Sequence, residues 1–288
     1  MRNVTKDNIT DAFAGYISKD SDPRLTEIMT SLASHLHAFV RETGLTHAEW
    51  EKGIEMLEWA GNISDKERHE MVLLSDLLGV SSLVDLVNMV PGGSSSSVLG
   101  PFHISGAPAI PFGVDLKRHY PGPVLVAQGV IQNMEGVPIK RATIDIWQTA
   151  PNGLYSSQDP EQDTYSFHGI QTVEDDGRYG FTTVKPVSYE VPTDGPGGAL
   201  LEATGRHAWR PSHLHFIVKA EGYRTLVSEV FAGDDPYLDQ DAVFGVREDL
   251  VMFYKDMPTG TFPEGYALSG QVDEAFLQVD FDLTLVRE

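Results

Sequence analysis

The sequence contains no cysteine among its 288 residues. Disulfide bonds, zinc–thiolate sites, iron–sulfur clusters and thiol nucleophiles are therefore all excluded. Any metal chemistry in this protein must use the side chains of histidine, tyrosine, aspartate or glutamate.

Positive charge is also scarce, because 21 Lys and Arg residues face 42 Asp and Glu residues, which gives a formal net charge of −21. So acidic a surface repels phosphate backbones and anionic lipids, and we expect neither nucleic acid nor a membrane as a partner. No apolar window approaches a membrane span, and residues 1–16 lack the apolar core of a signal peptide. These absences predict a soluble, cytoplasmic protein.

The composition is otherwise that of an ordinary globular chain, with 41% apolar and 22% charged residues. Between about residues 7 and 90 the apolar residues recur at helical spacing. Asp22 and Pro23 are typical of a helix start, and the amphipathic face that follows is the clearest of the region. This face consists of Leu25, Ile28, Met29, Leu32, Leu36, Phe39 and Val40.

Three further helices are predicted in the same region. Thr46 with Glu49 and Ser64 with Glu67 each fit a capping box that opens a helix. A short helix is expected from Leu83 to Val90. Residues 91–97, Pro-Gly-Gly-Ser-Ser-Ser-Ser, then change the composition in a way typical of a flexible connection between domains. We therefore predict a helical N-terminal domain over residues 1–97.

From residue 98 to 288 short β-favouring runs alternate with turn signals, which is typical of an antiparallel sandwich or barrel. Asp175-Asp176-Gly177-Arg178 is expected to form a hairpin turn between residues 171–173 and 179–181. The fold class predicted is mainly β, an antiparallel β-sandwich with an α-helical N-terminal domain. The expected strands cover residues 124–130, 143–147, 179–184, 213–218, 225–231 and 276–286.

Two histidines lie one pleat apart in Arg210-Pro-Ser-His-Leu-His-Phe-Ile-Val218. Alternate residues of a strand share a face, so His213 and His215 can bind one metal ion. Imidazole suits zinc, copper, iron and nickel, and the pair alone does not choose among them. Tyr155 and Tyr189 lie upstream in segments punctuated by glycine and proline. Taken alone, the same residues are also explained as ordinary strand histidines and as tyrosines that are hydrogen-bonded to backbone.

Phenolate is a hard, anionic donor, and it favours a hard ion of high charge such as ferric iron. Tyr155 and Tyr189 as phenolates, with His213 and His215 neutral, make a near-neutral four-ligand site once a hydroxide takes the fifth position. Metal binding would pull the tyrosine pKa values far below their usual value of about 10.

Six motifs run through the second part of the chain in a fixed order: Gly153–Ser156, Asp175–Phe181, Pro186–Tyr189, Asp194–Pro196, Gly205–His207 and Arg210–Phe216. In order and spacing they resemble the intradiol ring-cleavage dioxygenases of the catechol 1,2-dioxygenase type. The resemblance extends to Leu99–His103, to the strand end Trp147–Ala150 and to the helical N-terminal region, so it covers nearly the whole chain. Within the family, residues 73–79 and 239–246 are most similar to the hydroxyquinol 1,2-dioxygenases.

This resemblance implies one Fe(III) per subunit, with Tyr155 and His213 as equatorial ligands and Tyr189 and His215 as axial ligands. The aromatic diol would displace Tyr189, which leaves as a phenol and so acts as a base. Dioxygen would cleave the ring between its two hydroxyl-bearing carbons. The implied substrate is hydroxyquinol (benzene-1,2,4-triol), which would give 3-hydroxy-cis,cis-muconate or maleylacetate. The alternative is catechol or a chlorocatechol, which would give cis,cis-muconates.

The resemblance also assigns roles around the metal. Arg210 would stabilise negative charge that builds on the ring, and Asp76 would bind a third ring hydroxyl. Catechol-type members often carry glutamine on the strand after the histidines, whereas Glu229 stands at that position here, so the second polarising group is left open. The implied substrate wall comprises Leu73, Asp76, Val98, Leu99, Gly100, Pro101, Phe102, Val191, Pro192 and Val243.

The family pairs its subunits through the helical region and can enclose a lipid there, so the resemblance implies a homodimer. Two other classes of function remain open from the residues themselves. One is a non-catalytic β-sandwich binding module in which the histidines and tyrosines are structural. The other is a divalent-iron or zinc hydrolase, which would need carboxylate ligands such as Glu229 or Glu221 near His-x-His. No direct catalytic role is expected for Tyr165, His168 or His207.

Overall fold

The computed structural model of the chain describes residues 3–66, 68–269 and 275–288. The chain divides into two compact units, one up to residue 58 and one from residue 59 onward. Within the described ranges, no helix combines the length and the apolar character that a bilayer crossing requires. The domain boundary expected after residue 97 lies inside the second unit, and it stays a prediction.

The first unit is helical. It contains α1 (Ile9–Tyr16), α2 (Pro23–Thr43) and the first part of α3 (His47–Ile63). The predicted start of α2 is confirmed, because Pro23 is its first residue and the Asp22 carboxylate accepts a hydrogen bond from the Leu25 N–H at 2.8 Å. The capping box that opens α3 is also confirmed, since the Glu49 carboxylate accepts from the N–H of Thr46 at 2.8 Å.

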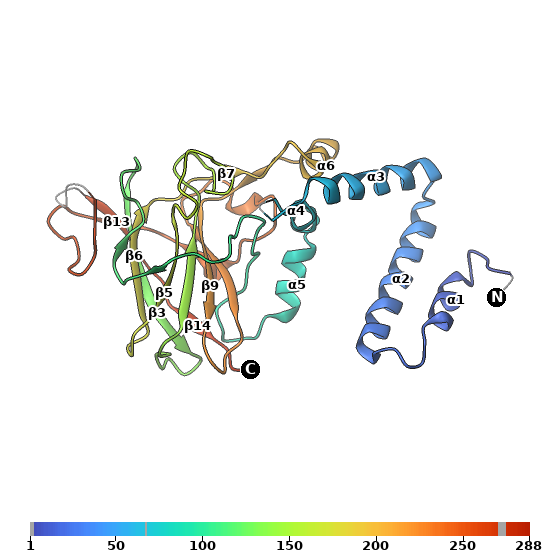
Figure 1. Ribbon diagram of the computed structural model, residues 1–288, viewed down its shortest axis with the longest axis horizontal. Coiled ribbons are helices and arrows are strands. Elements are labelled where there is room, and N and C mark those ends of the chain that lie inside the picture. Colours follow the sequence, from blue (N-terminus) through green and yellow to red (C-terminus); the bar gives the residue numbers. More distant parts are fainter. Residues whose placement is uncertain (1–2, 67, 270–274) are drawn as a thin grey trace. The chain divides into compact units, whose positions relative to one another are not determined.

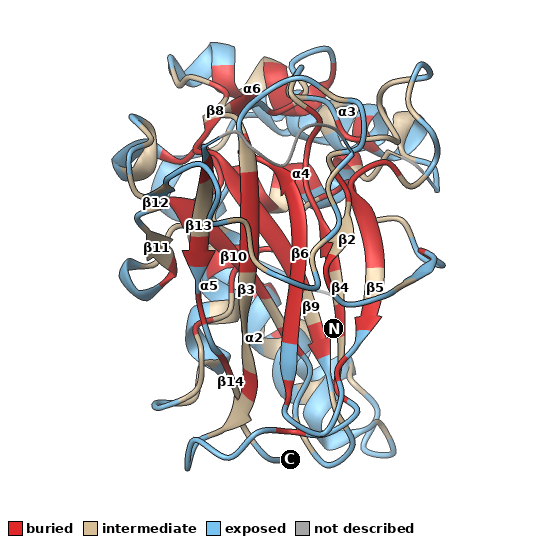
Figure 2. Ribbon diagram, turned by 90° about the vertical axis from the view of Figure 1, so that its left-hand side faces the viewer, coloured by how far each residue is buried: buried red, intermediate tan, exposed pale blue. Residues whose placement is uncertain are grey.

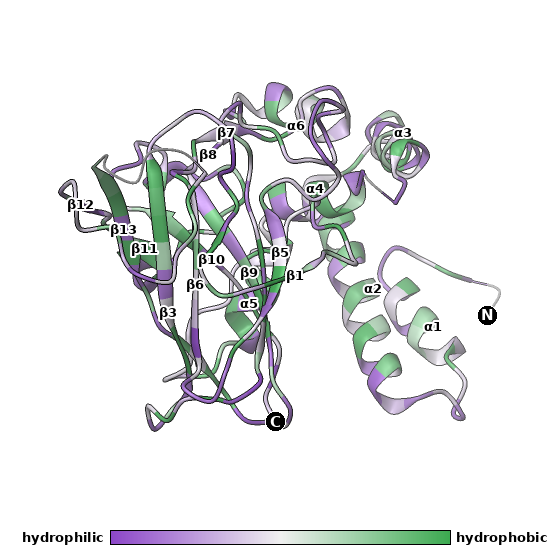
Figure 3. Cartoon of the chain, turned by 60° about the vertical axis from the view of Figure 1, so that its left-hand side comes forward, coloured by the Kyte–Doolittle hydropathy of each residue, from purple (hydrophilic) through white to green (hydrophobic). Residues whose placement is uncertain are grey.

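The predicted apolar face of α2 is exposed in the single chain. Figure 3 colours the apolar residues of this helix green, between purple polar ones. Leu25 is 55% exposed and Leu36 is 53% exposed. Exposing such a row of apolar side chains to water is unfavourable, and a second surface that covers them would be stabilising. The face is therefore suited to contact a partner.

Three helices belong to the second unit: α4 (Glu70–Leu77), α5 (Val80–Asn88) and α6 (Pro196–Thr204). The predicted start of α5 at Leu83 is wrong by three residues, because Gly79 adopts a left-handed conformation with φ of 71° and lets the helix begin at Val80. The capping box predicted for Ser64 and Glu67 involves Glu67, which lies outside the described residues. Ser64 instead donates its hydroxyl to the Ala60 carbonyl at 2.7 Å.

Two six-stranded sheets form the β-sandwich within the described residues. The strand bounds, in the order of the first sheet, are β1 (Ala109–Ile110), β5 (His168–Thr172), β4 (Thr143–Trp147), β9 (His213–Lys219), β10 (Leu226–Ala232) and β11 (Val251–Met252). The second sheet contains β12 (Lys255–Met257), β13 (Phe276–Asp280), β3 (Val124–Asn133), β6 (Arg178–Val184) and β2 (Val114–Asp115), with β14 (Leu283–Leu285) also paired to β3. Figure 1 shows these strands in sequence colours. A separate two-stranded ribbon joins β7 (Tyr189–Glu190) to β8 (Trp209–Arg210), and two short 3-10 helices cover Leu238–Gln240 and Glu248–Leu250.

The predicted fold class is confirmed, with one refinement. The central pairs β4–β5, β4–β9, β9–β10 and β3–β6 are antiparallel, whereas the pairs made by β1, β2, β11, β13 and β14 with these strands are parallel. The sheets are therefore mixed. Their inner faces meet in one core, where Phe181 of β6 and Phe216 of β9 are fully buried. Figure 2 shows the buried strand interiors in red.

Two expectations about connections are wrong. The turn at Asp175–Arg178 exists, with Gly177 in the left-handed region, but it links β5 of one sheet to β6 of the other, so the two strands are not a hairpin. The serine-rich segment is not a flexible connection either. Ser95 and Ser97 are buried, and the Ser94 N–H donates to the Thr284 carbonyl at 3.0 Å.

Candidate metal centre

Four side chains from three parts of the second unit converge on one point. Leu214 and Phe216 of β9 point into the sandwich core, so His213 and His215 turn to the opposite face of the same strand. Tyr155 comes from the loop after β4, and Tyr189 opens β7. All four of these side chains are buried, with at most 5% exposed.

The oxygen and nitrogen atoms of these side chains lie at contact distance. The hydroxyl of Tyr155 is 3.2 Å from the hydroxyl of Tyr189, 3.0 Å from Nε2 of His215 and 3.4 Å from Nε2 of His213. The two Nε2 atoms are 3.0 Å apart. The structure thus brings together all four residues that the sequence singled out as ligands.

The ring orientations leave lone pairs directed at this point. Nδ1 of His213 is 2.6 Å from the Pro211 carbonyl oxygen, which can only accept, so Nδ1 carries the proton and Nε2 is free to act as a ligand. His215 is held flat against Trp147, with ring centroids 4.6 Å apart and an angle of 3° between the planes. Two facing Nε2 atoms repel each other if both present lone pairs, and a cation between them removes that repulsion.

Burial favours the neutral form of all four side chains. It raises the pKa of Tyr155 well above its ordinary value and also raises the pKa of Tyr189. It lowers the pKa of His213 to about 4 and that of His215 well below its usual range, with Arg210 adding to the effect on both. The imidazoles are therefore neutral near pH 7. Two neutral imidazoles and two phenols that a cation can deprotonate fit a hard trivalent ion such as ferric iron.

A buried arginine borders this cluster. Arg210 opposes Tyr189 across the β7–β8 ribbon and is 2% exposed, with Nη1 at 3.3 Å from Nε2 of His213. Asp241 accepts from its Nε at 3.0 Å and from its Nη2 at 3.1 Å. Glu229 lies on the other side, 2.8 Å from Nη1. Two carboxylates therefore hold the guanidinium in one orientation.

Glu229 could itself be considered as a metal ligand, because its Oε1 is 3.4 Å from Nε2 of His213 and 3.4 Å from Nδ1 of His215. That contact to His215 is to the nitrogen on the far side of the ring from Tyr155. Its Oε2 accepts from Arg210 and pairs with the hydroxyl of Ser97. Glu229 is thus placed to orient His215 and Arg210, and the tyrosines are better placed as co-ligands.

Five of the residues expected to form the substrate wall are buried apolar side chains. Leu73, Val98, Val191 and Val243 pack together in one buried apolar cluster. Phe102 stacks on Tyr155 at 4.9 Å between ring centroids.

Backbone and exposure distinguish the remaining wall residues. Gly100 has a φ of 72°, and a side chain added there would begin 3.6 Å from Cε1 of His215. Pro101 is buried, and Pro192 borders an outer groove of about 630 Å³ with Tyr189. Leu99 is 41% exposed, so its side chain is the most open of the set.

Asp76 lies on α4 and is 1% exposed, yet neither of its carboxylate oxygens makes a hydrogen bond to a described residue. Burial raises its pKa to about 6, although the nearby Ser81 hydroxyl and Arg210 partly oppose that rise. A buried carboxylate with so few donors around it can accept a further hydrogen bond, which indicates a place for a ligand hydroxyl.

Sequence reasoning missed Asp241 as a partner of Arg210. The two residues are 31 positions apart, and Asp241 lies in a loop after a short 3-10 helix. The only available signal was its place in the Asp239–Val246 motif, which was noted for its resemblance and not for charge pairing. Sequence reasoning also missed a second cluster of His103, Asp145 and His168, which is described below.

Comparison with known proteins identifies the family of this chain. A family model described as "Dioxygenase" matches residues 100–286, and one described as "Catechol dioxygenase N terminus" matches residues 22–91. A 6-chlorohydroxyquinol 1,2-dioxygenase of Cupriavidus pinatubonensis is 40% identical over 264 residues, which cover 91% of this chain and 96% of that protein. A hydroxyquinol 1,2-dioxygenase of a Rhizobium species is 42% identical and covers 92% of this chain and 90% of that protein.

Among solved structures, the hydroxyquinol 1,2-dioxygenase from Pseudomonas putida DLL-E4 superposes with a TM-score of 0.85 at 40% sequence identity. The superposition covers 98% of this chain and 99% of that one. The matches thus extend over both the helical region and the β-sandwich that carries the four converging side chains. The chain belongs to the intradiol ring-cleavage dioxygenases, a family of iron-dependent oxidoreductases.

Proposed function

We propose that this chain is a hydroxyquinol 1,2-dioxygenase that holds one ferric ion through Tyr155, Tyr189, His213 and His215. The observation that carries the proposal is the convergence of two phenols and two neutral imidazoles, with their oxygen and nitrogen atoms 3.0–3.4 Å apart. When bound there, ferric iron supplies a Lewis acid that favours the deprotonated form of an aromatic diol.

The chain's own residues then have separate tasks. Tyr189, as a phenolate, is a base that can accept a proton from a substrate hydroxyl, and its oxygen lies inside the cluster, 3.2 Å from the hydroxyl of Tyr155. Arg210 presents a fixed positive charge to the electron-rich ring of the deprotonated diol, from which dioxygen then takes electron density. A preorganised charge in a buried site can lower such a barrier by about 3 kcal/mol. Phe102 and Trp147 cover the ligands and exclude water.

The preferred substrate follows from Asp76. A carboxylate whose buried oxygens have no donor among the described residues gains most from a substrate that brings a third hydroxyl, as hydroxyquinol does. The relatives whose names specify hydroxyquinol or its 6-chloro derivative support the same choice. Catechol or a chlorocatechol is the alternative substrate, and it would leave Asp76 without a partner.

The test combines colour with product. Iron-loaded protein should be reddish through charge transfer from tyrosinate to iron, and anaerobic hydroxyquinol should shift the spectrum at lower concentration than catechol. In air, one O2 should be consumed for each hydroxyquinol, with 3-hydroxy-cis,cis-muconate or maleylacetate as product. A protein that stays colourless after iron loading would refute the ligand assignment. A tighter response to catechol would move the proposal to the alternative substrate.

We further propose that the chain forms a homodimer through its helical region. The exposed apolar stripe of α2 supports this, because Leu25, Leu36 and their neighbours form a continuous surface that a second copy can cover. Bound lipid at this surface, the domain boundary after residue 97 and the location of the protein in the cell stay predictions. Analytical ultracentrifugation tests the dimer directly, and a monomer at micromolar concentration would contradict it.

A further inference from the structure

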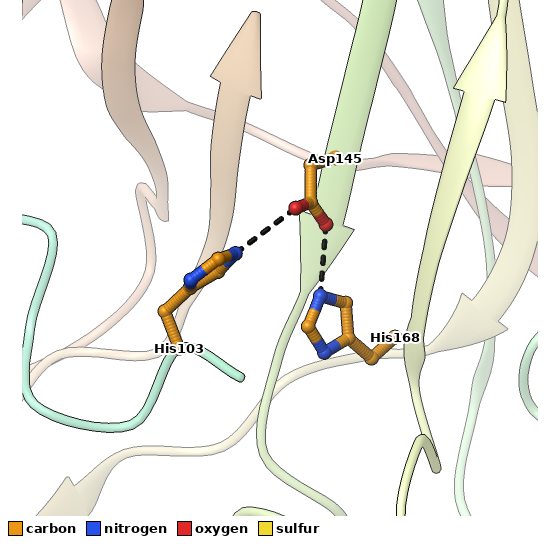
Figure 4. Close-up of side chains that lie close together, drawn as sticks. All are labelled: His103, Asp145 and His168. Carbon is orange, nitrogen blue, oxygen red and sulfur yellow. Dashed lines mark hydrogen bonds and ion pairs between the residues drawn. The ribbon is translucent and has the colours of Figure 1, made fainter. Parts of the chain in front are cut away.

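A second set of metal-ligating side chains lies outside the cluster described above. His103 comes from the segment before β1, Asp145 from β4 and His168 from the first position of β5 (Figure 4). Nε2 of His103 is 2.9 Å from one carboxylate oxygen of Asp145, and Nε2 of His168 is 2.8 Å from the other. The three ligand atoms lie within 4.8 Å of one another.

We propose that His103, Asp145 and His168 form a second cation site, which takes a divalent transition-metal ion of the zinc class. Two imidazole nitrogens and one carboxylate are a common three-ligand set for such ions, with water in the open position. The set contains no phenol. Its single negative charge suits a divalent ion better than the trivalent ion expected at the four-ligand cluster.

Solvent access supports an exchangeable site. The side chains of His103 and Asp145 are 16% and 15% exposed, and that of His168 is 4% exposed. A water molecule can therefore reach the open side of the three-residue site. Trp147 stands beside both sites, edge-on to His103 at 4.7 Å and stacked on His215 at 4.6 Å.

The carboxylate of Asp145 is already directed at both rings, since each of its oxygens accepts a hydrogen bond from one imidazole. Each imidazole now directs Nε2 at the carboxylate. When a metal ion binds, it takes the position of the Nε2 proton, and each neutral ring then carries its single proton on Nδ1, by exchange with solvent. No electron transfer or further reactant is required.

Occupancy would fix the segment that covers the ring-cleavage site. Gly100 lies against His215, and Phe102, the neighbour of His103, stacks on Tyr155. An ion at His103 ties this segment to β4 and β5 through Asp145 and His168. The site is thus a structural clamp, and its binding of metal does not depend on the proposed ring-cleavage activity.

The test is a calorimetric titration of the iron-loaded full-length protein with Zn²⁺, followed by dialysis and measurement of both metals. We expect one Zn²⁺ per chain with iron content unchanged. His103→Gln and His168→Gln keep an N–H donor for Asp145 but remove the imidazole, so each should weaken Zn²⁺ binding by about tenfold or more. His35→Gln, at an exposed histidine of α2, is the matched control and should bind as the parent does.

Four outcomes would overturn the proposal. Zn²⁺ could fail to bind the iron-loaded protein, or iron could leave in proportion to the Zn²⁺ gained, which would assign the binding to the four-ligand cluster. Equal affinity in all variants and competition by excess Mg²⁺ would mean that the acidic surface alone binds the ion. A Zn²⁺-dependent rise in the melting temperature of the parent chain, measured without any variant, provides a second readout, and no rise at saturating Zn²⁺ would also contradict the site.

Discussion

The two histidine-containing clusters of this protein differ in how well they are satisfied without an ion. In the His103–Asp145–His168 cluster, each carboxylate oxygen already accepts a hydrogen bond from an imidazole. In the four-ligand cluster, by contrast, the two Nε2 atoms face each other at 3.0 Å, and the hydroxyl of Tyr155 lies within 3.4 Å of both.

This difference indicates different degrees of dependence on metal. Two buried Nε2 lone pairs that face each other raise the free energy of the folded chain, so an ion that engages both should bind tightly. A cluster whose atoms already bond to each other must break those bonds to admit an ion. We therefore expect tight, near-permanent binding at the four-ligand cluster and weaker, exchangeable binding at the other.

The largest expected effect comes from removing one phenol of the four-ligand cluster. Tyr155→Phe deletes an oxygen that lies within 3.4 Å of Tyr189, His213 and His215. The four side chains act as a unit, so removing one of them should cost most of the effect of all four. Ring-cleavage activity should therefore fall by about 10³-fold or more. Iron content and the absorbance near the charge-transfer band should fall with it, as metal analysis and visible spectroscopy would reveal.

The matched control for this change lies beside the other cluster. The Tyr165 ring packs on His168, and its hydroxyl donates to the Ser105 carbonyl at 3.1 Å. Tyr165→Phe should leave iron content and colour unchanged. Equal loss of iron in the two variants would mean that any tyrosine change near these histidines disturbs the fold, and the contrast between the clusters would not hold.

A smaller effect is expected from a change at Asp76, whose two carboxylate oxygens are buried and make no hydrogen bond to a described residue. Asp76→Asn removes the charge but keeps the size of the side chain. A hydrogen bond to a charged group contributes about 1.5–3 kcal/mol, so kcat/KM for hydroxyquinol should fall by about tenfold or more. The value for catechol should change little, and steady-state oxygen uptake with both substrates measures the ratio. Equal losses on both substrates would remove Asp76 from substrate recognition.

The smallest expected effect is on the pH dependence of stability, to which Asp76 and Asp145 contribute with opposite signs. The pKa of Asp76 is raised to about 6 in the folded chain, so the folded state binds more protons than the unfolded state, and stability declines as pH rises from about 4 through 6. Between pH 5 and 8, the free energy of unfolding of Asp76→Asn should therefore fall by about 1 kcal/mol less than that of the parent. The lowered pKa of Asp145 has the opposite sign, since its contribution is lost only as pH falls below the usual range.

Urea unfolding of the iron-loaded parent and of Asp76→Asn at pH 5 and pH 8 measures this difference. The parent should lose more of its free energy of unfolding than the variant over that interval. Parallel losses in both proteins would show that the Asp76 carboxylate ionises in the folded chain as easily as it does in the unfolded chain.

Local patterns in the sequence predicted much of this fold. The strand expected at residues 143–147 coincides with β4, because alternating burial is a property of neighbours along the chain. The ligand set was also accessible, since two histidines on one strand must share a face. The resemblance to a family supplied the two tyrosines as their partners.

Features that depend on distant contacts could not be predicted in this way. The turn at Gly177 reads as a hairpin locally, but the pairing of β6 with β3 in the opposite sheet overrides that pattern. Ser97 looks like part of a linker, yet Glu229 and the Gly245 carbonyl bury its hydroxyl. Asp241 meets Arg210 only because the chain returns to the ribbon 31 residues later.

The two-stranded ribbon sets the spacing between a phenol and a positive charge. Tyr189 on β7 and Arg210 on β8 are paired in register, and the guanidinium is held by Asp241 and Glu229. The Tyr189 hydroxyl is 3.2 Å from the hydroxyl of Tyr155. Because backbone pairing joins the two residues, a shift of either strand would move the phenol and the guanidinium together. The ribbon therefore acts as a common frame for both groups.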